Sequence, residues 1–145
     1  MLTLEEAVSI AEGENGIAVA ATLRADSTIQ SSLVNAGVLA HPSTAEKVLA
    51  FVTYGRVKIA NLRARPQIAV TFRTGGTWAT VDGTAELAGA DSPQDWLDPE
   101  GLRRLFRDVF TAAGGEHDDW DEYDRVMAEQ RRTVVLVRPT RIYSN

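Results

Sequence analysis

Short apolar runs rich in β-forming residues recur along the chain and are separated by polar turn-like segments, as in β-strands joined by turns. Few of these runs are separated by a helical pattern, which favours an antiparallel barrel over a parallel sheet with helical crossovers. The sequence therefore predicts a mainly β fold with six to seven antiparallel strands and inserted helices. The expected strands are Ile17 to Leu23, Ile29 to Leu39, Val48 to Tyr54, Ile68 to Phe72, Trp78 to Leu87, Thr133 to Val137 and Thr140 to Tyr143.

Apolar residues recur at helical spacing in four other segments, two of them late in the chain. The first is a short lid helix, with Thr3 and Glu6 as a capping box and Gly13 as its stop. Another has Pro99 in its first turn, where proline is favoured. The predicted helices are Leu2 to Glu12, residues 55 to 63, Pro99 to Ala113 and Asp118 to Gln130.

Length and composition indicate one globular domain spanning residues 1–145. Hydrophobic residues make up 44% of the chain and charged residues 24%, which is ordinary globular usage. No apolar run reaches the roughly 20 residues of a membrane-spanning helix, and the first residues lack a signal-peptide pattern. We therefore expect a cytoplasmic protein that does not contact membranes.

Several chemistries are disfavoured by what the sequence lacks. It has no cysteine, and His41 and His117 are far apart, so neither a disulfide nor a metal site is expected. The net charge of −5 argues against nucleic acid as a partner. Glycine-rich nucleotide loops, serine-hydrolase elbows and zinc-protease motifs are all missing, and no catalytic side chain is predicted.

The segment after the third predicted strand places two cations at the start of a helix. A helix start carries unpaired N–H groups and partial positive charge, so Arg56 and Lys58 are unfavourable there unless an anion lies among them. Of the fifteen basic residues only Lys47 and Lys58 are lysines, and lysine is a compact point charge suited to phosphate. This pattern predicts a bound phosphate, with a solvated lysine as the alternative.

The acidic stretch from Gly115 to Tyr123 opens the last helix with five carboxylates, as the helix dipole prefers. This explanation is simpler than a glycosidase-type acid pair. His117 is interpreted as a capping or packing residue.

Two further features leave alternatives open. Trp78 follows a Gly-Gly turn, where an indole either stacks on a planar ligand or covers the barrel rim. Arg131 and Arg132 join the last helix to a strand and are either solvated or recruited to an anion at a subunit interface.

The segment Arg56-Val-Lys58-Ile-Ala-Asn61-Leu62 resembles the phosphate-binding signature of the split β-barrel flavin and deazaflavin proteins, related to pyridoxamine 5′-phosphate oxidase. The resemblance extends over nearly the whole chain, through Gln30-Ser-Ser32, Trp78, residues 115–123 and Arg131-Arg132. It is greatest to the actinobacterial branch that binds coenzyme F420, a deazaflavin hydride carrier.

This resemblance implies a six-stranded split barrel that pairs as a homodimer, with cofactor sites between the subunits. Arg56, Lys58 and Asn61 would hold the cofactor's phosphate and anionic tail. Trp78 and Arg132 would reach the site from the partner subunit. Flanking the ring system would be Thr53, Tyr54, Gly55, Ile59 and Ser32 to Val34.

The implied function is an F420-dependent reductase that transfers a hydride from the reduced deazaflavin to a conjugated small-molecule acceptor. The proton that accompanies the hydride would come from solvent or a nearby tyrosine. One rival is an FMN-binding oxidoreductase, since both cofactors carry a ribityl phosphate. The other is a non-catalytic carrier or sensor of a cofactor, haem or another planar molecule.

Overall fold

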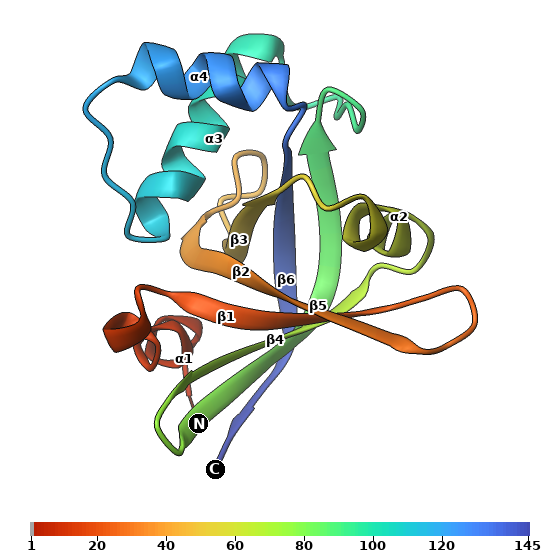
Figure 1. The fold of residues 1–145 in the computed structure, drawn as a ribbon, viewed down its shortest axis with the longest axis vertical. Helices are drawn as coiled ribbons and strands as arrows, with labels where there is room; N and C mark the ends of the chain where they lie inside the picture. The colour runs from red at the N-terminus through yellow and green to blue at the C-terminus, as the bar shows by residue number, and fades with distance from the viewer. Residues whose placement is uncertain (1) are drawn as a thin grey trace.

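Six strands close into an antiparallel barrel, in the order β1-β2-β3-β6-β5-β4, in the computed structural model, which describes residues 2–145 (Figure 1). The predicted mainly β fold with inserted helices is confirmed. The two strands expected near the C-terminus are one strand, because Pro139 pairs with Gly83 and the ladder continues beyond a register shift. The strands are β1 Ile17–Leu23, β2 Ile29–Ala40, β3 Lys47–Thr53, β4 Gln67–Thr74, β5 Thr77–Gly89 and β6 Thr133–Ser144.

The barrel interior is filled by the inward face of each strand. In β4 these residues are Ile68, Val70 and Phe72, and they alternate with less buried neighbours. β3 and the first half of β6 are instead apolar on both faces, because their outer face is also covered. Leu105 and Val109 pack there against β3 and β6.

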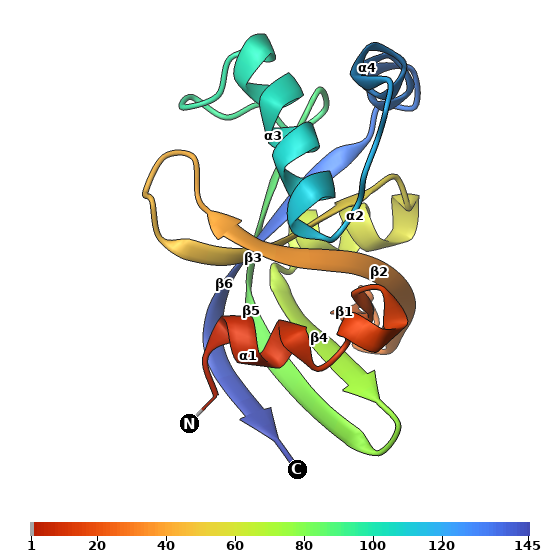
Figure 2. The ribbon, with the colours of Figure 1, turned by 90° about the vertical axis from the view of Figure 1, so that its left-hand side faces the viewer.

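Four α-helices cover the barrel: α1 Leu4–Ser9, α2 Arg56–Ala64, α3 Pro99–Ala112 and α4 Trp120–Glu129, with a short 3-10 turn at Glu12–Glu14. α1 is shorter than predicted, and its Leu4 and Ala7 pack into the barrel core. α3 and α4 lie together at one end of the molecule, while α2 lies beside the barrel wall (Figures 1 and 2).

Two further findings concern chemistry and location. Among residues 2–145, no helix combines the length and apolar character needed to cross a bilayer. Within that same range, histidine and carboxylate side chains do not gather in groups of three that would suit a metal ion.

Candidate functional site

The start of α2 differs from that of the other three α-helices in residues 2–145. Thr3, Asp98 and Asp119 each cap their helix with a side-chain oxygen, and each of these helices has a carboxylate in its first turn. α2 begins at Gly55 with no side-chain cap and no acidic residue. Its first N–H groups and the positive end of its dipole are therefore available to an anion.

Lys58 is buried at this helix start, although lysine is rarely buried without a partner. Only 6% of its surface is exposed. Among residues 2–145 its Nζ has one hydrogen-bond partner, Thr53 Oγ1 at 3.5 Å, and it lies 5.7 Å from the centre of the Phe51 ring. No carboxylate of residues 2–145 pairs with this ammonium group, and burial lowers the pKa of Lys58. Arg56, by contrast, is exposed and makes no ion pair within the described chain.

Polar side chains from β1, β2, β3 and α2 form a group at the barrel end that α2 adjoins, and Lys58 joins it through Thr53. Asn61 is buried, and its Nδ2 donates to Thr22 Oγ1 at 3.0 Å. Thr22 Oγ1 in turn donates to Gln30 Oε1 at 3.2 Å. We call this group the polar end of the barrel; its members are Thr22, Gln30, Ser32, Thr53, Lys58 and Asn61.

Ser32 and Val34 of β2 belong to this region through strand register. Ser32 lies opposite Ala20 and Val34 opposite Ala18, two residues of β1 that are buried in the barrel on the same face as Thr22. Ser32 Oγ is buried and has no hydrogen-bond partner among residues 2–145. A buried hydroxyl without a partner is unfavourable, so this atom is suited to a ligand.

Sequence reasoning did not select Thr22 or Gln30 as site residues. Thr22 follows Ala18 and Ala20 on the inward face of β1. A polar residue on this otherwise apolar face was the sequence feature that could have identified it. Of the residues that were selected, Ile59 packs against the barrel core and contributes a wall rather than a polar contact.

Tyr54 and Arg132 meet on the outer side of the barrel, next to Thr53. The guanidinium carbon of Arg132 lies 3.9 Å from the centre of the Tyr54 ring. The resemblance implies that Arg132 comes from the partner subunit. In this structure, however, Arg132 contacts Tyr54 of its own chain. Its role in cofactor binding stays a prediction.

Within one subunit, Trp78 does not lie beside Tyr54 and Arg132. It pairs with Arg73 beside the β4–β5 turn, and its ring contacts Tyr143 edge-on at 6.1 Å. The β4–β5 hairpin points to the end of the barrel away from α3 and α4 (Figure 1). In the isolated subunit Trp78 covers the barrel rim.

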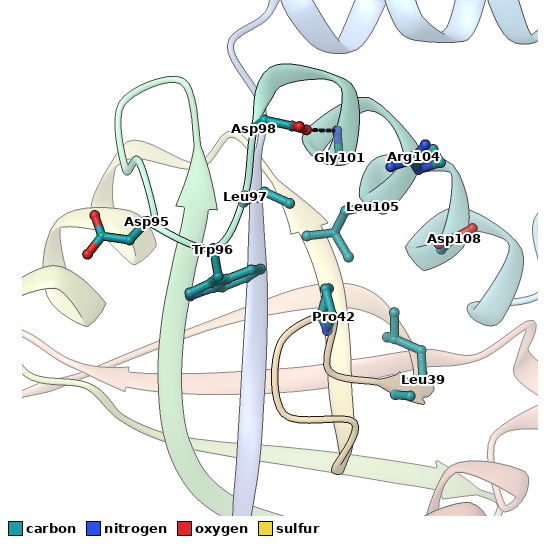
Figure 3. A pocket seen from close by; sticks show the side chains of 11 residues that line it. Leu39, Pro42, Asp95, Trp96, Leu97, Asp98, Gly101, Arg104, Leu105 and Asp108 are labelled. Atoms are coloured by element: carbon teal, nitrogen blue, oxygen red, sulfur yellow. Dashed lines mark hydrogen bonds between the residues drawn. The ribbon is translucent and has the colours of Figure 1, made fainter.

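A cavity of about 580 Å³ lies between the β2–β3 turn, the loop before α3 and α3 itself (Figure 3). Trp96, Leu97 and Leu105 form apolar walls, while Asp95 and Asp108 lie at its rim. None of the predicted site residues lines this cavity. A smaller cavity of about 380 Å³ lies between β2, β3, α3 and α4 and is lined in part by Arg132.

The barrel topology resembles that of several solved structures. The conserved hypothetical protein Rv2991 from Mycobacterium tuberculosis matches with a TM-score of 0.66 and 18% identity, over 99% of this chain and 84% of that protein. An F420 reductase matches with a TM-score of 0.58 and 20% identity, over 88% of each chain. A protein from Listeria innocua described as a putative pyridoxamine 5′-phosphate oxidase matches with a TM-score of 0.56 and 15% identity, over 94% of this chain and 92% of that protein.

The chain has the split β-barrel fold. Its closed barrel of six antiparallel strands matches neighbours that include both F420 reductase and pyridoxamine phosphate oxidase-like proteins, as the sequence resemblance predicted. No protein-family model matches the sequence. In this split barrel, the uncapped start of α2 and the polar end of the barrel adjoin each other through Lys58.

Replacing Lys58 by methionine should stabilise the protein in the absence of ligand. The exchange removes a buried charge and the repulsion from the α2 dipole, the latter worth about 0.3–1 kcal/mol. Because burial lowers the pKa of Lys58 on folding, the penalty is present while the ammonium is charged in the folded state and disappears as the pH rises towards the ordinary lysine value of about 10.4. Chemical denaturation between pH 7 and 10 measures both effects.

Lys47→Met is the matched control, because Lys47 is exposed and pairs with Glu5 on the surface. Its stability should stay close to that of the parent protein. A Lys58→Met variant that is less stable than the parent at pH 7 would contradict an uncompensated buried charge.

Proposed function

We propose that this protein is an oxidoreductase that binds reduced coenzyme F420 and passes its hydride to a conjugated small-molecule acceptor. The observation that carries the proposal is the buried Lys58 below a helix start that has neither cap nor carboxylate. Both features are unfavourable without a ligand, and one phosphate would compensate both. The fold shared with an F420 reductase adds support at the level of architecture.

Each residue at the start of α2 has a role in this proposal. The exposed guanidinium of Arg56 and the first N–H groups of α2 bind the phosphate and the anionic tail. The positive charge of Lys58 attracts the phosphate from the barrel side of α2. To contact the phosphate directly, its side chain must move out of the polar end of the barrel. Asn61 positions Thr22 and the inner wall.

The ring system is expected beside residues 53–55, between Tyr54 on the outer side and Ser32 on β2. Bound there, the reduced deazaflavin supplies a hydride, so the protein needs to orient and shield the reactants rather than provide a nucleophile. The unpaired Ser32 Oγ fits a polar edge of such a ring. FMN carries the same ribityl phosphate and is the competing cofactor.

A homodimer belongs to the same proposal. The outer face of β1 and β2 exposes large apolar side chains: Leu33 is 69% exposed and lies opposite Val19 in register, and Ile29 is 63% exposed. An apolar strand face of this kind is typical of a protein interface. Leu33 lies between Ser32 and Val34, so a partner docked on this face would adjoin the cofactor site, and the partner's Trp78 could close it.

Parallel titrations with F420 and with FMN test the cofactor assignment. We expect saturable binding of F420 and much weaker binding of FMN. Lys58→Met should weaken F420 binding by about ten- to a hundredfold, the value of one charge-assisted contact. Lys47→Met should bind like the parent protein.

An F420 affinity that is unchanged in Lys58→Met would refute the proposed site. Tighter binding of FMN than of F420 would identify FMN as the cofactor instead. Catalysis is tested separately with the reduced deazaflavin and a panel of quinone, enone and tetrapyrrole acceptors. Tight binding without oxidation above background would indicate a carrier instead of a reductase.

The dimer is tested by Leu33→Glu, which places a charge in the centre of the apolar strand face. The parent protein should be a dimer by light scattering at low micromolar concentration, and Leu33→Glu should be a folded monomer with weaker F420 binding. Thr111→Glu, on the exposed side of α3, is the control and should remain dimeric. A parent monomer that binds F420 fully would rule out a site completed by the partner.

A further inference from the structure

The smaller cavity beside Arg132 has the composition of a ligand site. Its volume of about 380 Å³ is within the range of ~300–1,000 Å³ common for small-molecule sites. We call it the α3–α4 cavity, since both helices form walls over the outer face of β2 and β3. Its apolar lining consists of Val52, Val109, Phe110, Ala113 and Met127, and its polar lining of Asn35, His117, Tyr123 and Arg132.

Arg132 differs from the arginines around it. Arg103 and Arg107 both pair with Asp124, at 3.1 and 2.5 Å, and Arg131 pairs with Asp91 at 2.5 Å. Arg132 pairs with no carboxylate among residues 2–145.

The contacts of Arg132 leave most of its hydrogen-bonding capacity unused. Its Nε donates to Gln130 Oε1 at 2.7 Å, and its face stacks on Tyr54. A guanidinium has five N–H donors, so Arg132 retains donors for an anionic or carbonyl oxygen in the cavity.

His117 offers a second unused donor. Its Nδ1 accepts the backbone N–H of Asp119 at 3.0 Å, which leaves the proton of the neutral ring on Nε2. Within the described residues Nε2 has no hydrogen-bond partner. The His117 ring is fixed among Phe110, Trp120 and Tyr123, with ring centres 5.7–6.1 Å apart.

Tyr123 is the polar neighbour that is already engaged. Its hydroxyl donates to the carbonyl of Phe106 at 2.8 Å, and burial raises its pKa to about 12. Tyr123 therefore contributes an aromatic wall but no available donor. The amide nitrogen of Asn35, in its favoured orientation, donates to the backbone carbonyls of Asn15, Gly16 and Ala113. Two donors therefore remain in a largely apolar cavity, those of Arg132 and His117.

We propose that the α3–α4 cavity binds the hydride acceptor, a planar and largely apolar molecule that carries a carboxylate or conjugated carbonyl oxygen. Arg132 holds this oxygen, and His117 Nε2–H donates a second hydrogen bond. The assignment of this ligand as acceptor rests on the proposed function, because Tyr54, which stacks on Arg132, belongs to the segment assigned to the cofactor ring. Arg132 thus lies between the two ligands.

The larger cavity does not fit this ligand class. Three carboxylates, Asp95, Asp98 and Asp108, line it against a single arginine, Arg104 (Figure 3). An anionic or carbonyl oxygen would be repelled there. The charge balance of the α3–α4 cavity is the reverse, since its one charged side chain is Arg132.

Binding of 2-naphthoate to the cofactor-free protein, measured by calorimetry beside its neutral methyl ester, tests the cavity directly. We expect saturable binding of the acid at one site per chain, tighter than that of the ester. Arg132→Gln should weaken the acid about ten- to a hundredfold and change the ester little. Arg131→Gln, which removes the adjacent paired arginine, is the matched control and should leave both affinities unchanged.

Two more variants separate the contributions of shape and donor. His117→Asn keeps an acceptor for the Asp119 N–H but removes Nε2, and should weaken the acid several-fold. Ala113→Leu fills the cavity from the half-exposed end of α3 and should abolish binding of both probes.

Absence of saturable 2-naphthoate binding, or equal affinity in Arg132→Gln and the parent, would overturn the proposal. The F420 titration reports on the other site independently. Naphthoate binding without F420 binding would refute the reductase and leave the cavity as a site for apolar acids. F420 binding without naphthoate binding would refute the cavity as a ligand site and leave the proposed cofactor site in place.

Discussion

The burial of the Lys58 ammonium group is the constraint on which the rest of this site depends. β3 carries the chain to Thr53, and the turn into α2 places Lys58 in the barrel end with Thr53 Oγ1 as its one hydrogen-bond partner in the described chain. Burying an unpaired charge is costly, and the positive end of the α2 dipole adds to the cost. The proposed anion would compensate both costs and make this arrangement favourable.

The geometry also divides the candidate site into two sides. The polar end of the barrel lies inside, below α2, whereas Tyr54 and Arg132 lie outside, beside the α3–α4 cavity. Only the short segment 53–55 separates them. A cofactor held at the start of α2 can therefore present its ring close to a second ligand, which is what a hydride transfer between two bound molecules requires.

Local patterns in the sequence were sufficient for the elements. The β-rich run from Ile17 to Leu23 identified β1 with the bounds that the structure shows, and the charges at Arg56 and Lys58 singled out α2. Contacts between residues distant in the sequence could not be predicted from these local patterns. The hydrogen bond from Asn61 to Thr22 joins residues 39 positions apart, and the ring of Tyr54 meets Arg132 only after β3 and β6 pair. Two strands were predicted on either side of Pro139, but Pro139 pairs with Gly83 and the ladder continues through it.

The central claim is that the start of α2 binds a phosphate, and amide NMR of the dimer or monomer with phosphorylated and unphosphorylated ligands tests it most directly. Adding F420 should shift the backbone amides of residues 56–58 strongly, and the same deazaflavin without its phosphate tail should leave them nearly unmoved. The amides that open α3, already capped by Asp98, serve as the internal reference. Equal shifts with both ligands, or none at residues 56–58, would contradict the account.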